Sequence, residues 1–456
     1  MRKIAIITAP LLLFTALSSC NLYKTYKTPE IEEVENIYRI SSALDDTTSI
    51  ASLGYKELFT DSELQKLIDE GLESNSDIQI ALLQIEQAQA SLYAARLSYL
   101  PSLSAGASAS TSSFDGAKAS NNYSLSLSAA WEIDIFGKKW NAKEKAIAAV
   151  DESYAYKQAV RSRLIATIAE SYYTLLMYDK QLEISKANLV IREENLRVLR
   201  ALKLNSTTTD AAIAQAEASK IKVEASLLTL QKQISTVENS LSTLLGSVAS
   251  SIERGSLDIQ NFPSEISYGL PITMLRTRAD IKIAEYNYAQ AHYTTNEARA
   301  NFYPSISLSG SAGWTNSSGG VVADPMALLL SAAASLTQPI FNKGTNTANL
   351  KISEAAQEAA AVEFRQTVLE AGAEVNDALI QWQTAKSRLE LSSKEIASQQ
   401  RALHATELLM KHGSTNYLEV LVAQQSLLDA QLTSVSDKYD EISGVINLYY
   451  SLGGGN

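Results

Sequence analysis

The sequence predicts a mostly α-helical chain with a few β-strands suited to a membrane, and its two halves repeat one another. Three observations support this fold class. From Lys138 to Leu245 the chain contains neither glycine nor proline, and between Gly344 and Gly413 only Gly372 occurs, so both stretches favour long helices. Four short segments alternate apolar residues with serine, a pattern that predicts strands. The whole order of parts occurs twice along 456 residues.

The first twenty residues, MRKIAIITAPLLLFTALSSC, have the pattern of a bacterial lipoprotein signal. A positively charged start precedes the apolar stretch Ile4–Leu17, which is short for a membrane span. Cys20 is the only cysteine of the chain and stands where a lipobox requires the lipidated residue. We expect diacylglyceryl and N-acyl groups on Cys20, where each buried CH₂ contributes about 0.8 kcal/mol to anchoring. The alternative is an ordinary secretory signal followed by an unrelated cysteine.

Composition excludes several classes of function. The formal net charge of −11 argues against a nucleic-acid partner, because such binding needs lysine and arginine to neutralise phosphates. Apart from Cys20 there is no thiol for redox chemistry. The three histidines, His292, His404 and His412, lack a second ligand at metal-site spacing. No phosphate-binding loop or Gly-x-Ser-x-Gly motif occurs, so we expect no enzyme activity, no metal and no cofactor besides the lipid.

The duplication is visible without gaps over 28 positions. Asp77–Ser104 matches Asp280–Ser307 at an offset of 203, and eleven of the 28 pairs are identical. Further on, Ala214–Glu217 resembles Ala423–Ser426 at an offset of 209. A repeat of about 200 residues is too long for a solenoid unit. We therefore expect two halves that fold into one pseudo-symmetric protomer.

Each half is expected to contain a helix of moderate length, a β-hairpin and two long helices joined by a tight turn. Apolar residues recur every seventh position in the second half, which indicates supercoiled helices: Val368, Val375, Trp382, Leu389, Ile396, Leu403 and Met410. The predicted segments are a signal peptide at 1–19, an N-terminal anchor and equatorial segment at 20–61, helices at 62–100 and 278–303, hairpins at 101–136 and 304–341, long helical pairs at 137–246 and 342–452, an equatorial linker at 247–277 and a tail at 453–456.

The strands alternate in the manner of a transmembrane barrel with a wet interior. Segments of about ten residues, bounded by aromatic residues, place apolar side chains on one side and serines on the other. Four strands cannot enclose water, and open sheet edges are not tolerated in lipid. We therefore expect three copies to close a twelve-stranded barrel, continued by a helical tunnel. The residues expected to face its lumen include Ser104, Ser126, Ser307 and Ser309.

The local motifs resemble those of the TolC-type outer-membrane efflux proteins, particularly their lipid-anchored branch. The resemblance covers essentially the mature chain and rests on the order of several motifs: AARLSYLPSLS, ARANFYPSIS, WEIDIFGK, LTQPIFNK, LPITMLRTRADIKIAE, HGSTNYLEVLVAQQSLLDAQL and LYYSLGGG. The family's usual Arg-Pro-Asp appears here as Arg278-Ala279-Asp280. The resemblance implies a homotrimer with a periplasmic tunnel that docks a periplasmic adaptor and an inner-membrane transporter and passively conducts what the transporter delivers, most often small molecules.

The resemblance also places the working sites at the two turns between long helices. Asp210 and Glu419 match positions where the family has acidic residues facing the closing pore, and threefold symmetry would repeat each as a ring that favours cations. Both also fit helix first turns, where the helix dipole stabilises carboxylates. The tips expected to contact the adaptor are Asn205, Ser206, Thr207, Gly413, Ser414 and Thr415.

Some family members latch the tip with a tyrosine and an arginine. Those places hold Met410 and Thr415 here, so the resemblance does not extend to that latch.

Two other functions fit the same features. One is an outer-membrane conduit for type I protein secretion, which would use the same pore. The other is a coiled-coil surface lipoprotein that tethers or scaffolds without conducting, for which the amphipathic strands would be unnecessary.

Overall fold

The computed structural model describes residues 23, 25–29, 50, 53–204, 208–260, 262, 277–315 and 329–455. Cys20 and the tip residues Asn205, Ser206 and Thr207 lie outside the described residues, as do the predicted signal peptide and parts of the two predicted equatorial segments. The chain divides into two compact units, considered separately below. Unit 1 comprises Met1–Glu30, Gln84–Tyr154 and Ile283–Arg365, and unit 2 comprises Ile31–Leu83, Ala155–Lys282 and Gln366–Asn456.

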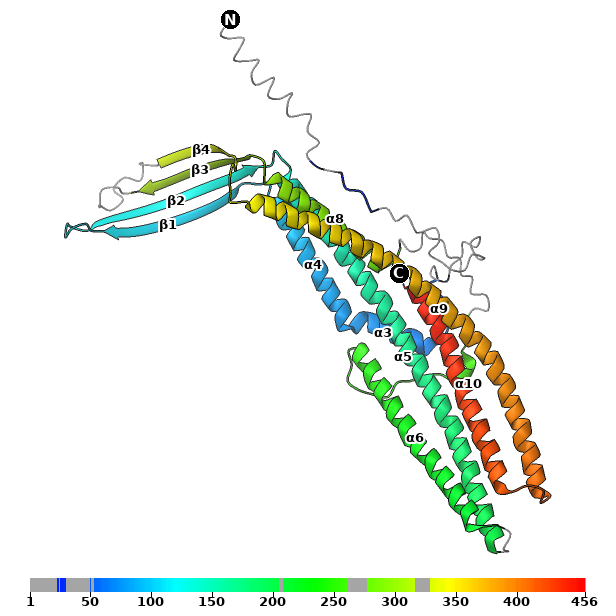
Figure 1. Ribbon diagram of the computed structural model, residues 1–456. Helices are drawn as coiled ribbons and strands as arrows, with labels where there is room; N and C mark the ends of the chain where they lie inside the picture. Colours follow the sequence, from blue (N-terminus) through cyan, green and yellow to red (C-terminus); the bar gives the residue numbers. More distant parts are fainter. Residues whose placement is uncertain are drawn as a thin grey trace. The chain divides into compact units, whose positions relative to one another are not determined.

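A four-stranded antiparallel sheet characterises unit 1 (Figure 1). Its strands follow the chain order: β1 (Ser102–Ser112), β2 (Ser120–Ile133), β3 (Ser305–Thr315) and β4 (Leu329–Thr337). The β2–β3 pairing joins the first hairpin to the second, and β1 and β4 form the two edges. Alternation along each strand separates an apolar face from a hydroxyl-rich face, as the sequence pattern predicts.

The serines of the polar face hydrogen-bond to one another within each hairpin. In the first hairpin the hydroxyl oxygens of Ser104 and Ser128 lie 2.8 Å apart, and those of Ser108 and Ser124 lie 2.7 Å apart. The second hairpin repeats this arrangement, with separations of 2.6 and 2.7 Å for its two pairs, Ser307–Ser335 and Ser311–Ser331. The duplication therefore preserves individual side-chain contacts as well as the strands.

Two glycines begin the long helices that follow the hairpins. Gly137 has a φ of 67° and precedes α5 (Lys138–Leu204), whereas Gly344 has a φ of 79° and precedes α9 (Thr345–Lys411). Glycine adopts this left-handed conformation without the steric penalty of a Cβ atom. The chain therefore turns sharply at the same point in each half.

Unit 2 contains the tips of both long helical pairs, and α6 (Asp210–Leu244) and α10 (Tyr417–Ser451) lie wholly within it (Figure 1). The short helices α2 (Tyr55–Leu58) and α3 (Ser62–Ser74) and the 3₁₀ turn η4 (Leu257–Ile259) pack there too. Its core joins apolar side chains of both halves, including Ile168, Leu175, Leu241, Val375 and Ile442. Burying this apolar surface is the main force that holds the helices together.

Equivalent helices have equal lengths in the two halves. α4 (Ser76–Leu97) and α8 (Ala279–Ala300) have 22 residues each, α5 and α9 have 67, and α6 and α10 have 35. The helix-capping residues Thr209 and Asn416 are 207 positions apart, which corrects the predicted offset of 209 at this point. The similar letters AQAE and AQQS thus stand at non-equivalent positions, because helix caps and core positions define the true register.

The segment 62–100, expected as one helix, contains two. α3 ends and α4 begins on either side of Asn75, whose backbone is extended with a φ of −64° and a ψ of 132°. The Asn75 side-chain oxygen accepts hydrogen bonds from the backbone N–H groups of Asp77 at 2.8 Å and Ile78 at 3.3 Å. Asparagine is a favoured N-cap, so it begins a new helix where the chain changes direction.

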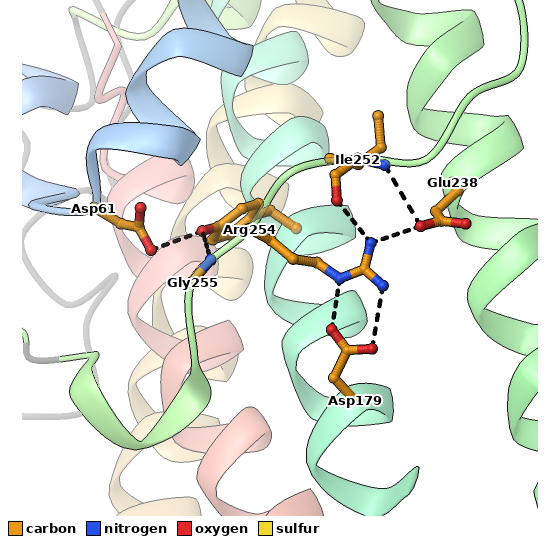
Figure 2. A network of polar contacts seen from close by, with 7 residues as sticks. Asp61, Asp179, Glu238, Ile252, Arg254 and Gly255 are labelled. Atoms are coloured by element: carbon orange, nitrogen blue, oxygen red, sulfur yellow. Dashed lines mark hydrogen bonds and ion pairs between the residues drawn. The ribbon is translucent and has the colours of Figure 1, made fainter. Parts of the chain in front are cut away.

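Within unit 2, a partly buried ionic cluster fixes the segment after α6 to the helices (Figure 2). Arg254 donates to Asp179 of α5, with 3.1 Å between Nη2 and Oδ1, and to Glu238 of α6 at 2.6 Å. Close by, the Tyr172 hydroxyl accepts a hydrogen bond from the Gly255 N–H at 3.0 Å and donates to Asp61 at 2.7 Å. This loop thereby ties the middle of α5 to the C-terminal part of α6.

None of the described helices has a run of apolar residues sufficient to cross a bilayer.

Candidate functional site at the helix tips

The turn between α9 and α10 has a well-defined backbone geometry. Gly413 has a φ of 74°, its N–H donates to Met410 at 3.0 Å, and the Ser414 N–H donates to Leu409 at 2.9 Å. These bonds form a Schellman motif, which satisfies the last carbonyl groups of α9. Gly413 is therefore the left-handed C-terminal cap of α9. The Asn416 side chain then caps α10 by accepting from the N–H groups of Leu418 and Glu419.

Both predicted acidic residues lie in the first turn of a helix. Asp210 is the first residue of α6, which is capped by Thr209, and its carboxylate forms an ion pair with Lys203 of α5. Glu419 is the third residue of α10, and its side chain is exposed. Since the caps are 207 positions apart, the residue of α6 that corresponds to Glu419 is Ala212 rather than Asp210. The two acids therefore stand at different levels of their helices.

A buried arginine joins three helices close to these tips. Arg192 of α5 is 2% exposed, and its guanidinium donates to Asn188 on its own helix at 3.0 Å, to Ser219 of α6 at 2.5 Å and to Gln425 of α10 at 3.1 Å. All three acceptors are neutral. Gln425 in turn donates to Asp429 at 2.8 Å, which connects the arginine to a carboxylate through one amide. Burial lowers the pKa of Arg192, while Tyr417 and Asp429 act in the opposite direction.

Apolar packing around Tyr417 connects the tips of the two helical pairs. Tyr417 packs with Ile213 against a small buried cluster made of Leu196, Leu199, Ala216 and Leu421. Burial raises the pKa of Tyr417 to about 12, so its hydroxyl stays neutral at physiological pH. The side-chain oxygens of Thr415 and Tyr417 are both buried and have no hydrogen-bond partner within the described part of the chain.

The structure therefore brings together some predicted tip residues and leaves others untested. Gly413, Ser414 and Thr415 form one turn, and Asp210 and Glu419 begin the helices after each turn. Arg192 and Tyr417 were not predicted as site residues. A sequence signal for Arg192 was present. In α5, apolar residues recur every seventh position at Leu182, Leu189 and Leu196, and Arg192 and the buried Leu199 each lie three residues after a member of this series, at the second core position of the heptad.

The predicted lumen residues share one face of the sheet. Ser104 and Ser307 belong to the hydroxyl pairs, Ser126 lies between Gly106 and Gly313, and Ser309 lies between Ala130 and Ala333. Among the described residues, no group of three or more histidines, cysteines or acidic residues could hold a metal ion. The helix tips offer charged side chains, and the hydroxyl face of the sheet offers hydrogen-bonding groups.

Comparison with known proteins establishes the family. The model of the outer membrane efflux protein family matches residues 67–247 and 270–454. The chain belongs to that family. It is 28% identical over 457 residues to the cation efflux system protein CusC of Escherichia coli O6:H1, covering 98% of both chains. It is 27% identical over 417 residues to the probable outer membrane lipoprotein SilC of Salmonella typhimurium, covering 89% of both chains.

A solved structure has the same fold. The crystal structure of the open state of the MtrE outer membrane channel of Neisseria gonorrhoeae superposes with a TM-score of 0.84 at 29% identity, covering 96% of this chain and 98% of that one. The predicted fold class, mostly helical with a small sheet for the membrane, is confirmed. The chain is an outer-membrane efflux channel protein, and its family consists of channels rather than enzymes.

Proposed function

We propose that three copies of this chain form the exit duct of a tripartite efflux system. The observation that carries this proposal is the sheet of unit 1, which has an apolar face, a hydroxyl face and two free edges in β1 and β4. In lipid, such edges must pair with other strands. Three copies supply twelve strands, enough to surround a water-filled lumen.

Exposure of the apolar face supports the membrane location of the sheet. Leu103 and Leu330 are each 69% exposed in the isolated chain, and Leu125 and Leu336 are also exposed. Strands of 9–14 residues match the length needed to cross a bilayer. Apolar side chains face lipid in this arrangement, and Ser104, Ser126, Ser307 and Ser309 line the lumen.

The lipid anchor and the partners follow from the same proposal. Acyl chains on Cys20 hold each copy at the outer membrane, while the helical tips reach into the periplasm. There the turns around 205–207 and 413–415 contact a periplasmic adaptor, which connects the duct to an inner-membrane transporter. The channel conducts passively and takes small solutes, consistent with the word "cation" in the name of CusC.

The tip carboxylates provide the charge selectivity of the closed end. Asp210 and Glu419 are exposed, and threefold symmetry repeats each of them around the pore axis. Their negative potential attracts cations and excludes anions. Lys203 partly neutralises Asp210, so Glu419 contributes more of the selectivity.

Planar-bilayer recording tests this function. We expect purified, lipidated protein to be a trimer in detergent and to give unitary, cation-selective currents. We expect Glu419→Ala to reduce the cation preference more than Asp210→Ala does. A strictly monomeric protein, or one that never conducts at any voltage or pH, would contradict the proposal and favour the scaffold function. Rescue of protein export but not of solute resistance in a channel-deficient strain would favour the type I secretion conduit.

A further inference from the structure

Within the strands that the structure describes, a single residue has a formal charge, Glu132 near the end of β2. It pairs in register with Ser307 of β3, which belongs to the hydroxyl face. The preceding residue, Trp131, belongs to the apolar face, and its indole N–H donates to the Tyr99 carbonyl at 2.8 Å. Successive residues of a strand point to opposite faces. Anchoring Trp131 on the apolar side therefore fixes the Glu132 carboxylate on the hydroxyl side.

The rest of this face is electrically neutral. Many of its serine hydroxyls bond to one another, as in the pairs Ser104–Ser128 and Ser307–Ser335. Hydroxyls arranged in this way interact weakly with charged solutes compared with a carboxylate. The four described strands hold no lysine or arginine, so Glu132 alone sets the sign of the formal charge on the strand wall.

The neighbouring charged groups leave this carboxylate without an ion pair in the described structure. The Lys139 ammonium donates to two main-chain carbonyl oxygens, those of Ser98 at 2.7 Å and Glu132 at 2.8 Å. Glu132, Asp134 and Lys138 line a pocket of about 240 Å³ at the end of β2. The Asp134 carboxylate accepts a hydrogen bond from the backbone N–H of Trp140 at 2.8 Å. The Glu132 side chain is exposed, so its charge acts on ions in the solvent beside the strand.

The second half of the chain offers no counterpart. Hydroxyl pairing aligns Ser128 with Ser335, an offset of 207, so the position equivalent to Glu132 is Pro339, which follows β4. The charge is thus specific to the first hairpin. Each copy of the chain contributes one such carboxylate.

We propose that Glu132 is a selectivity residue of the barrel, separate from the acids at the helix tips. This inference rests on the proposed trimer, in which three Glu132 carboxylates form a ring at the end of the barrel nearest the helices. The ring favours cationic solutes, binds multivalent cations and slows anions. The duct then has a ring of carboxylates on the strands in addition to those at the tips.

The experiment starts from Asp210→Ala/Glu419→Ala, which removes the tip acids. In planar bilayers at low salt, we expect this double variant to keep a preference for K⁺ over Cl⁻ and a residual block by the trivalent hexaamminecobalt ion. Adding Glu132→Gln, which changes a carboxylate to an amide of the same shape, lowers the K⁺/Cl⁻ permeability ratio at least about twofold and weakens the block. Adding Glu132→Lys instead inverts the preference.

A matched control makes the same chemical change elsewhere in unit 1. Asp115→Asn alters an exposed carboxylate in the turn between β1 and β2 and should leave the permeability ratio unchanged. Detergent-extracted trimers of equal mass show that the variants assemble. If the channels conduct normally but Glu132→Gln and Glu132→Lys leave selectivity and block as they were, this inference is wrong while the proposed function stands. If the unaltered protein gives neither trimers nor currents, both are wrong.

Discussion

The junction between α6 and α4 and the junction between α10 and α8 occupy equivalent places in the two halves, yet different side chains close them. At the first, the Asn75 amide donates to the carbonyl of Leu244, the last residue of α6, at 2.8 Å. At the second, the Arg278 guanidinium donates to the carbonyl of Ser451, the last residue of α10. A glycine follows each helix in the left-handed conformation, Gly246 with a φ of 67° and Gly453 with a φ of 83°.

In both halves a carbonyl group at the helix C-terminus accepts a hydrogen bond from a side chain, but the residue that donates it differs. Helix C-termini leave carbonyl groups unsatisfied, and both junctions supply a buried donor for one of them. Asn75 is neutral and needs no counter-ion. Arg278 brings a charge, so it also requires carboxylates, which Asp280 and Glu374 provide, each at 2.6 Å from the guanidinium. The second junction consequently includes α9 as well as α8 and α10.

The largest effect is expected from Arg278→Ala. It removes the donor to Ser451 and leaves Asp280 and Glu374 without their cation, which we expect to lower the free energy of unfolding by about 3 kcal/mol. Arg278→Lys keeps the charge and should recover part of the loss. Denaturant unfolding of the detergent-solubilised protein, followed by helical circular dichroism, measures both. A loss no larger than that of Asn75→Ala would show that the ionic contacts add nothing.

Substitution of the glycine at each junction should reveal a second difference in stability between the two junctions. A Cβ on Gly246 would lie 2.8 Å from the Ser74 carbonyl oxygen, a backbone atom, whereas one on Gly453 would lie 3.3 Å from the flexible Arg278 side chain. Both substitutions also strain a positive φ. We expect about 2 kcal/mol for Gly246→Ala and about 1 kcal/mol for Gly453→Ala. Equal losses in the same unfolding assay would contradict this order.

A smaller effect is expected from Asn75→Ala, about 1 kcal/mol, because it removes a helix cap and one bond to a carbonyl. Asn75→Asp retains the cap but not the amide donor, so it should recover only part of the stability. Hydrogen exchange at the first turn of α4 and the last turn of α6 measures the local loosening. Protection unchanged at both sites in Asn75→Ala would show that the side chain is dispensable.

The smallest effect is expected in the pH dependence of stability, through Asp61 and its contact with Tyr172 of α5. Burial of Asp61 acts to raise its pKa, but hydrogen bonds from Tyr172, Gln260 and the Glu63 N–H outweigh it and hold this pKa below its ordinary value. As pH falls, the unfolded state takes up the proton first, so this stabilisation is present above about pH 4 and decreases below it. Asp61→Asn should flatten the acid side of the stability profile. The corresponding residue to Tyr172 on α9 is Leu379, which can make no such bond.

The repeated elements could be predicted because helix and strand patterns are local. The absence of glycine and proline defined α5, and the serine alternation defined β1 and β3 with their polar faces. The register of α6 against α10 could not be read from similar letters, since it depends on which residues cap helices and which reach the core. Asn75 was likewise hidden inside an amphipathic stretch, although asparagine is a strong cap.

The site was predictable where backbone chemistry dictates it and hidden where tertiary contacts do. Gly413 could be assigned from its position between two helices. For Arg192 the heptad indicates a core position, but its partners could not be predicted, because Ser219 and Gln425 reach it from two other helices. Glu132 required the strand register to show that it stands alone on a neutral face.

Among the described strands, the two hairpins meet through the pairing of β2 with β3, in antiparallel contacts from Ser124–Thr315 to Ile133–Ile306. In the proposed barrel, β4 of one copy meets β1 of the next across the same kind of boundary. One polypeptide thus makes internally the contact that it also makes with its neighbours. Six shorter chains, each with one hairpin and one helical pair, would enclose the same bore, so the duplicated chain makes half of the hairpin-to-hairpin interfaces of the proposed barrel internal.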